Sequence, residues 1–206
     1  MTIHLVTPSR RDFVQGAGAL ALASMAPAIV RAQGVPLQLG VLTPLTGAGG
    51  FDGPRMVKAM QAVMDEVNAA GGLLGRKVVL VIEDDQTNPE AAVRAARKLI
   101  DVTKVPVIMG TWASAVTAAV APVCWESKTF LTTVSGADPI TLLPHQGYLI
   151  RTQPNSQMQG AKHAEYIAST GAKRVFIMSI QAPFSQPTQN RVREVLPKFG
   201  SELVGG

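Results

Sequence analysis

Cysteine and histidine are scarce in this sequence of 206 residues. The one cysteine, Cys124, has no partner for an internal disulfide and matches no metal-ligand spacing, so we predict that it is a small, buried, apolar side chain. His145 and His163 stand alone, without an H-E-x-x-H pattern, and neither histidine nor cysteine lies near the acidic run at residues 83–85. The sequence therefore predicts no metal site.

Motifs that bind phosphate or build a catalytic site are also absent. The glycine-rich turn Thr43–Gly53 follows a predicted strand, but Asp52 stands where G-x-G-x-x-G requires glycine, and no G-K-[ST] follows. A triad assembled from Ser135, Asp138 and His145 would have no nucleophile elbow. These absences predict a protein that is not an enzyme and that uses no cofactor.

Positive charge is in slight excess but is not concentrated. The net charge is +5, and three arginines against one aspartate place part of it in the first 32 residues. The sequence contains no dense run of lysine and arginine with interleaved aromatic residues, and aromatic residues make up only 5% of the chain. A nucleic-acid partner is therefore not expected.

Residues 1–32 have the pattern of an export signal. The pair Arg10-Arg11 precedes a short apolar stretch, Gly16–Val30, and a small-x-small ending at Ala32. The segment resembles a twin-arginine signal, although the leucine and lysine of its pattern, S-R-R-x-F-L-K, are replaced here. An ordinary secretory signal that carries two arginines stays open. Either signal predicts an exported protein that is cleaved near Ala32.

Apolar runs of strand length alternate with segments of helical periodicity along the rest of the chain. Six runs are predicted to be strands: Val35–Leu42, Lys77–Ile82, Val105–Met109, Thr129–Val134, Tyr148–Thr152 and Arg174–Ile180. Helices are predicted after the first, second, third and fifth of these strands. The alternation predicts an α/β fold with a mostly parallel sheet.

The strand-to-helix junction after the third strand is the most informative part of the sequence. Val105–Met109 ends at Gly110, and the small-residue turn Thr111–Ser114 leads into the helical segment Ala115–Trp125. In an open parallel sheet, such junctions lie at the carboxyl ends of the strands, where free N–H groups of the first helical turn meet a crevice. Ser114 is therefore predicted either to cap the helix or to offer its hydroxyl to a ligand carboxylate.

Six segments along the chain share a further pattern. They are T-P-L-T-G-A-G-G-F-D-G from Thr43, V-N-A-A-G-G-L-L-G-R-K-V from Val67, E-D-D-Q-T-N-P from Glu83, G-T-W-A-S-A-V-T from Gly110, S-G-A-D-P from Ser135 and I-R-T from Ile150. Together, and in this order, they resemble the leucine/isoleucine/valine-binding proteins of bacterial ABC importers. The N-A-A-G-G-x-x-G-R-K segment is the most specific of them.

This resemblance implies a type I periplasmic binding protein, with flavodoxin-like parallel sheets in two lobes and a ligand cleft between the lobes. It implies that residues 33–152 form the first lobe and that residues 153–206 begin the second. It also implies a periplasmic protein that closes on a small-molecule ligand, an amino acid or organic acid, and delivers it to the membrane subunits of an ABC permease.

The same resemblance implies a set of ligand-binding residues. In the family, the turns after the third and fourth strands hold the amino-acid backbone, and two aromatic positions line the cleft. The corresponding residues here are Phe51, Trp112, Ala113, Ser114, Ser135, Gly136, Ala137 and Phe184. The family usually has threonine at Ala137, Phe51 and Phe184 lack a phenolic hydroxyl, and Trp112 adds a large ring. The predicted ligand is a branched-chain amino acid or a related apolar or aromatic carboxylate or amide.

Members of that family are much longer than this chain. We therefore expect a fragment or a truncated product, with an incomplete second lobe and an exposed apolar sheet edge. Two other functions remain open from the sequence. One is a ligand-sensing domain of a receptor, and the other is an exported hydrolase on a flavodoxin-like sheet.

Overall fold

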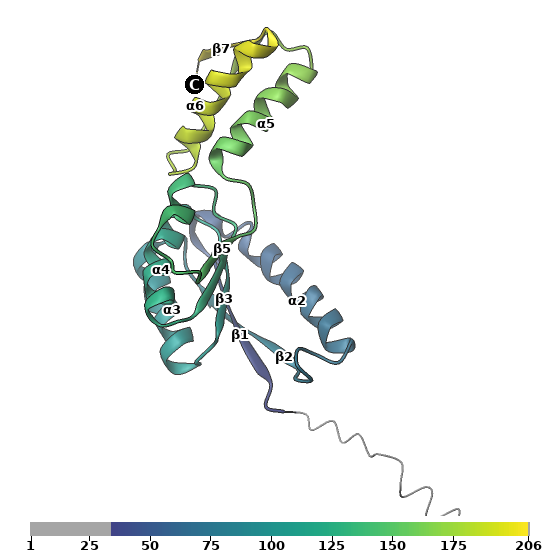
Figure 1. Ribbon diagram of the computed structural model, residues 1–206, viewed down its shortest axis with the longest axis vertical. Coiled ribbons are helices and arrows are strands. Elements are labelled where there is room, and N and C mark those ends of the chain that lie inside the picture. Colours follow the sequence, from purple (N-terminus) through teal and green to yellow (C-terminus); the bar gives the residue numbers. More distant parts are fainter. Residues whose placement is uncertain (1–33, 206) are drawn as a thin grey trace, which may run out of the picture. The chain divides into compact units, whose positions relative to one another are not determined.

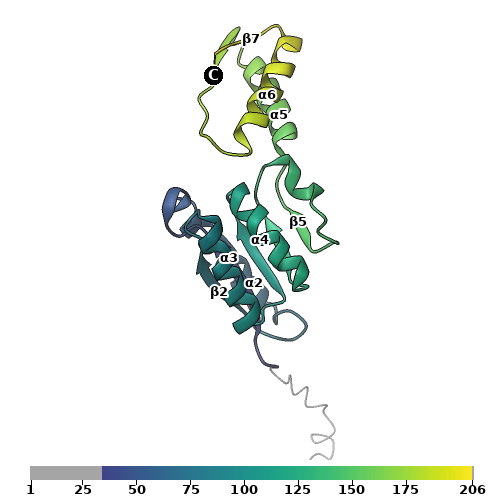
Figure 2. The same ribbon diagram turned by 90° about the vertical axis from the view of Figure 1, so that its left-hand side faces the viewer.

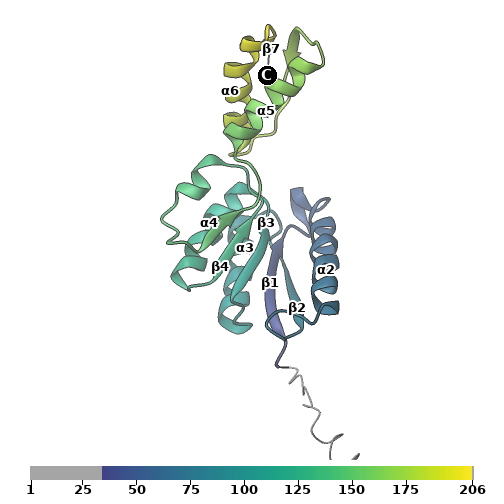
Figure 3. The same ribbon diagram turned by 45° about the vertical axis from the view of Figure 1, so that its right-hand side comes forward.

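A computed structural model describes residues 34–205. The predicted export signal lies outside the described residues. The larger sheet has five strands in the order β2-β1-β3-β4-β5, and all of its pairings are parallel (Figures 1 and 3). Its strands are β1 (Leu37–Thr43), β2 (Val78–Asp84), β3 (Val107–Thr111), β4 (Phe130–Thr133) and β5 (Leu149–Arg151). The predicted α/β fold with a parallel sheet is confirmed.

Helices cover both faces of this sheet. The helix α3 (Pro89–Arg97), continued by η2 (Lys98–Val102), lies beside α4 (Ser114–Glu126) on one face (Figure 2). The helix α2 (Gly53–Ala69) lies on the other face, against β1 and β2 (Figure 1). The start of α3 is fixed by its sequence, because the Asn88 side chain accepts a hydrogen bond from the Ala91 N–H at 2.8 Å and Pro89 is tolerated at a first helical position.

The larger apolar core lies between the sheet and the pair α3–α4. Ile108 and Leu131 are fully buried there, on neighbouring strands that pair with each other. Cys124 packs into the same core, and burial raises the pKa of its thiol to about 12. The prediction of a buried, unreactive cysteine is confirmed, because the thiolate is the reactive form.

A smaller sheet follows in the chain. It consists of β6 (Arg174–Phe176) and β7 (Glu202–Gly205), paired in parallel. The helices α5 (Ser156–Ser169) and α6 (Ser185–Val195), the latter continued by η4 (Leu196–Phe199), pack against each other and bury a second cluster that includes Ala164, Val192 and Leu196. The regular ladder of β6 is shorter than predicted, and β7 was not predicted.

Two short helical turns complete the fold: η1 (Gly47–Gly49) lies in the turn after β1, and η3 (Asp138–Leu142) follows β4. Among residues 34–205, no helix has the length and apolar content needed to cross a bilayer.

Candidate ligand-binding site

Three turns lie at the carboxyl ends of neighbouring parallel strands. They are residues 44–52 after β1, residues 112–113 after β3 and residues 134–137 after β4. In open parallel sheets, ligands bind outside this edge, because successive turns and helix starts meet there. The predicted site residues other than Phe184 all lie in these turns or at the first residue of α4.

The turn after β3 brings the start of α4 to this edge. The register of β3 shifts between Met109 and Thr111, and Gly110 between them has a φ of 101°, a left-handed conformation that glycine adopts without strain. Ala113 then occupies the N-cap position in an extended conformation, with φ −72° and ψ 131°, and no side chain caps the helix. The first N–H groups of α4 therefore lack an intrahelical or side-chain acceptor among the described residues.

Ser114 is the first helical residue and not the N-cap, so the capping alternative for its hydroxyl is wrong. Its side chain is buried, and its Oγ accepts a hydrogen bond from the Ala137 N–H at 3.2 Å. The Ser114 oxygen thus joins the turn after β4 to the start of α4. Its hydroxyl proton has no acceptor among residues 34–205 and can be donated to a ligand oxygen.

Ser135 is predicted to contact the ligand, but its hydroxyl is buried inside the fold. It is fully buried, its hydroxyl donates to the Trp112 carbonyl at 2.9 Å, and its N–H donates to Thr133 Oγ1 at 3.0 Å. Thr133 in turn donates to the Thr111 carbonyl at 2.7 Å, and Thr117 from α4 joins the same group of hydroxyls. Ser135 therefore connects the two turns from inside the fold, which leaves its hydroxyl neither exposed as a nucleophile nor free for a ligand.

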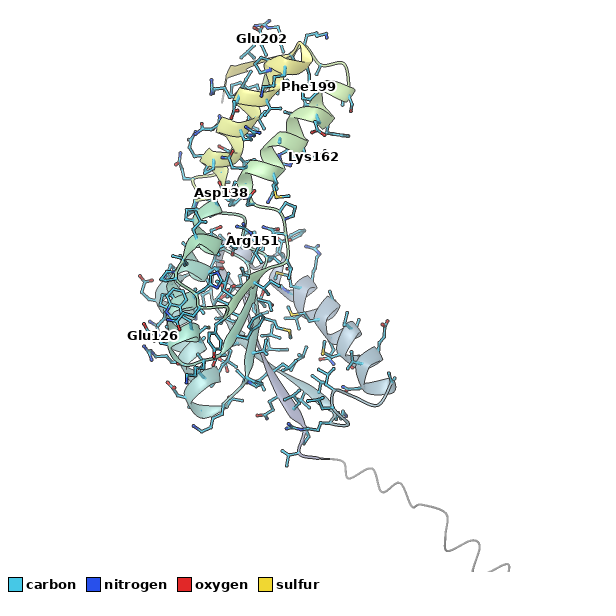
Figure 4. The ribbon with its side chains drawn as sticks, viewed as in Figure 1. Glu126, Asp138, Arg151, Lys162, Phe199 and Glu202 are labelled. Atoms are coloured by element: carbon cyan, nitrogen blue, oxygen red, sulfur yellow. The ribbon has the colours of Figure 1, made fainter. Side chains whose placement is uncertain are left out.

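Two residues that were not predicted to belong to the ligand site hold the turn after β4 in place. Arg151 of β5 donates to the Ala137 carbonyl at 2.8 Å and to Thr141 Oγ1 at 3.2 Å (Figure 4 labels Arg151 and nearby Asp138). Ser156, the first residue of α5, donates to the Gly136 carbonyl through both its N–H and its hydroxyl, each at 2.9 Å. Both carbonyls accept hydrogen bonds from the protein, so the fold holds the backbone of this turn in place. The orientation of its N–H groups therefore does not require a bound ligand.

The aromatic residues of the predicted site have different environments. Phe51 is 73% exposed, with the Arg55 guanidinium stacked 3.5 Å from its ring centre. Trp112 is half-buried and packs so closely on Gly49 that a Cβ there would lie 3.0 Å from the indole. Phe184, the residue before α6, is half-buried, and its Cβ lies beside Gly136. The structure thus places the Trp112 ring and the Cβ of Phe184 beside these turns and leaves Phe51 largely in solvent.

The last residue of β2, Asp84, fixes the loop that carries Phe51. The Asp84 carboxylate accepts hydrogen bonds from the Leu45 N–H at 2.8 Å and from the Thr46 hydroxyl at 2.6 Å. Burial alone would raise the pKa of Asp84, but these bonds and those from the Thr46 and Gln86 N–H groups lower it below its usual value. Asp84 therefore anchors this loop. Residues 34–205 contain no cluster of acidic, histidine or cysteine residues that fits a metal ion.

The next residue, Asp85, is fully buried, and only one of its two carboxylate oxygens accepts a hydrogen bond. Its Oδ1 accepts the Thr87 N–H at 2.7 Å, whereas its Oδ2 has no partner among residues 34–205. Burial raises the pKa of Asp85 to about 6, the neighbouring charge of Asp84 adds to this effect, and the Thr87 bond opposes it. At neutral pH the fold therefore holds an ionised carboxylate that is not fully solvated.

We expect Asp85→Asn to stabilise the protein at high pH and not at low pH. The pKa is higher in the folded state than in the unfolded state, so the unfolded state loses its proton first and stability falls as pH rises from about 4 to about 6. The amide keeps the acceptor for Thr87 and removes the charge, which should add about 2 kcal/mol at pH 8. Urea unfolding at pH 8 and pH 4 measures this, with exposed Asp101→Asn as the control. An equal gain at both pH values would contradict the assignment.

Buried hydroxyl bridges and an uncapped helix start lie at the carboxyl edge of the parallel sheet, the edge at which open α/β sheets bind their ligands. Residues 36–206 match the periplasmic binding protein family, and the chain belongs to this family.

Similar proteins support the same assignment. An amino acid binding protein of Pseudomonas aeruginosa is 28% identical over 197 residues, which cover 95% of this chain and 52% of the relative. The Leu/Ile/Val-binding protein BraC3 of Rhizobium johnstonii is 28% identical over 170 residues, covering 82% of this chain and 46% of the relative. The chain thus spans about half the length of these curated relatives.

Solved structures agree on the fold. The leucine binding protein LivK of Thermotoga maritima matches with a TM-score of 0.69 and 27% identity, over 82% of this chain and 48% of that protein. A solute binding protein of an ABC transporter from Rhodopseudomonas palustris, in complex with 3,4-dihydroxybenzoic acid, matches with a TM-score of 0.72 and 22% identity, over 83% of this chain and 46% of that protein.

Proposed function

We propose that this chain provides the ligand-binding turns of an exported solute-binding component of an ABC importer. The observation that carries the proposal is the start of α4, where uncapped N–H groups and the Ser114 hydroxyl lie beside the turn that contains Ala137. Such a helix start favours an anionic group, through both its free donors and the helix dipole. A carboxylate fits this arrangement, and the protein carries out no chemistry on it.

The proposed ligand is a branched-chain amino acid or a related apolar or aromatic carboxylate, with an amide as the weaker, uncharged analogue. Ala137 offers no side-chain hydroxyl to an amino-acid backbone, and Trp112 presents a large apolar surface next to the same turns. Related solved structures are described in complex with isoleucine and with 4-hydroxybenzoate, which supports both ligand classes. The contacting groups would come from Trp112, Ala113, Ser114, Gly136 and Ala137, with Phe51 and Phe184 lining the cleft.

In this proposal, residues 1–32 are an export signal that is cleaved near Ala32, and the protein acts in the periplasm. Residues 33–152 form a first lobe and residues 153–206 begin a second. The ligand is passed to the membrane subunits of an ABC permease. The family membership of residues 36–206 supports this assignment, because its members are periplasmic binding proteins.

Thermal unfolding in the presence of candidate ligands tests the proposal. The ligand would be bound on one side only, by the turns at the edge of the larger sheet. The free energy of a few charge-assisted hydrogen bonds, less the cost of association, then corresponds to a dissociation constant of about 1 mM. At 10 mM, leucine or 4-hydroxybenzoate should then stabilise the protein by about 1.4 kcal/mol and raise the Tm by about 3 °C. The matched amide, 4-hydroxybenzamide, should have a smaller effect. If no carboxylate raises the Tm more than its amide does, the proposed anion site is wrong.

A further inference from the structure

The peptide bond between Trp112 and Ala113 is held in one orientation by a buried side chain. Its carbonyl oxygen, which belongs to Trp112, accepts a hydrogen bond from the Ser135 hydroxyl at 2.9 Å. This is the only hydrogen bond that the Trp112 carbonyl accepts among residues 34–205. Ser135 is fully buried and follows β4, the strand beside β3 (Figure 3), so the carbonyl points from the turn after β3 into the fold.

The other side of the same peptide carries the Ala113 N–H. Residues 34–205 contain no cis peptide bond, and in a trans peptide the carbonyl and the following N–H point in opposite directions within one plane. The Ala113 N–H therefore points away from Ser135. It has no acceptor among residues 34–205, and it directly precedes the free N–H groups at the start of α4. The fold thus adds one more donor to this edge of the larger sheet.

The contacts of the buried hydroxyl groups determine where each proton goes, because every hydroxyl has one proton to donate. Thr133 donates its proton to the Thr111 carbonyl at 2.7 Å and has none left for Ser135. The Thr117 hydroxyl is in hydrogen-bond contact with the Ser135 oxygen and donates to it. The Ser135 proton is then available for the Trp112 carbonyl. Two consecutive hydrogen bonds thus connect α4 to the turn after β3.

We propose that Ser135 is a positioning residue of the anion site. Its hydroxyl sets the orientation of the Trp112–Ala113 peptide and thereby directs the Ala113 N–H toward the ligand. The inference rests on the proposed function, because the ligand of this N–H is the carboxylate proposed above. Ser135 does not touch the ligand and acts through one carbonyl, so a fully buried serine contributes to binding.

The orientation of this peptide decides which kind of ligand group the turn accepts. An outward N–H donates to a carboxylate oxygen, whereas an outward carbonyl would repel it. A complete reversal would require a positive φ at Ala113, which has a φ of −72° and, as an alanine, disfavours the left-handed region. Loss of the Ser135 hydrogen bond should therefore tilt the peptide and weaken one ligand bond without reversing the site.

The substitution Ser135→Ala in the full chain tests the proposal. The affinity for 4-hydroxybenzoate, measured by NMR titration, should fall about tenfold, the effect of losing one charge-assisted hydrogen bond. The affinity for 4-hydroxybenzamide should fall only about threefold, because its oxygen is uncharged. The matched control is Thr117→Val, which removes another fully buried hydroxyl of the same group but leaves the Trp112 carbonyl bonded. It should bind both ligands as the unmodified protein does.

A triple-resonance spectrum that correlates the Trp112 carbonyl carbon with the Ala113 amide observes the peptide without any ligand. Loss of a hydrogen bond moves a carbonyl carbon resonance upfield, so Ser135→Ala should move this resonance upfield and Thr117→Val should not. Circular dichroism checks that both variants fold. The unmodified protein provides a measurement that needs no variant, because bound 4-hydroxybenzoate should move the Ala113 amide proton downfield until the site is saturated.

Three results would each overturn the proposal: an unchanged Trp112 carbonyl resonance in Ser135→Ala, an equal affinity of the two variants for 4-hydroxybenzoate, or an Ala113 amide that does not respond to bound ligand. If the unmodified protein bound no carboxylate, the proposed function would be wrong, and the role of Ser135 in binding would be wrong with it. The carbonyl resonance would still decide whether Ser135 orients the peptide, so the two failures are distinguishable.

Discussion

Replacing Leu131 with alanine should lower the free energy of unfolding by about 3–4 kcal/mol, the typical cost of a cavity in a well-packed core. Leu131 is fully buried between the sheet and α3–α4. Its strand, β4, pairs with both β3 and β5, so the surrounding backbone has little freedom to close the cavity. Urea unfolding monitored by circular dichroism measures the change.

The matched control is Leu142→Ala, which removes the same atoms from a side chain that is 82% exposed. This change should alter the stability by less than about 0.5 kcal/mol. If the two variants lost similar stability, the core could not lie where the structure places it.

Replacing Ser114 with aspartate should abolish binding of anionic ligands while the protein stays folded. The new carboxylate would occupy the uncapped N–H groups of α4 and repel a ligand carboxylate, and the loss of a few charge-assisted bonds corresponds to about a 100-fold weaker affinity. A negative charge in the first helical turn is favourable and offsets part of the cost of placing a carboxylate at this buried position, so the protein should stay folded with a modestly lower Tm. Ligand titration and thermal unfolding of the same sample separate the two effects.

Ser127→Asp provides the control, because Ser127 is exposed at the other end of the same helix. There the charge opposes the helix dipole, so the variant should be slightly less stable but should bind ligand normally. If both aspartate variants lost affinity equally, general charge repulsion would be responsible and not the start of α4.

The sequence predicted the larger sheet well because its strands are apolar runs separated by glycine, proline and capping residues. It failed at the smaller sheet for physical reasons. The run predicted to extend to Ile180 leaves the regular ladder after Phe176, although the Ile177 N–H still donates to the Gly205 carbonyl at 3.0 Å. β7 has only four residues and ends in glycine, so it lacks an alternation long enough to recognise.

The site was predicted at the level of turns but not of individual atoms. The sequence located the junction after β3, yet it could not determine whether Ser114 caps the helix or is its first residue, since that depends on one backbone conformation. The inward direction of the Ser135 hydroxyl depends on Thr133 and Thr117, which only the folded sheet brings together. The role of Arg151 likewise arises from a contact between distant segments.

Backbone amide resonances give the most direct test of the proposed binding site. A ¹H–¹⁵N correlation spectrum of the full chain is recorded during titration with 4-hydroxybenzoate and, separately, with leucine. The account predicts saturable shifts of the Ser114, Ala115 and Val116 amides and of Ala137, whose N–H is bound to Ser114. Saturable binding that shifts other amides and leaves Ser114–Val116 unchanged would contradict the claim that the start of α4 holds the ligand.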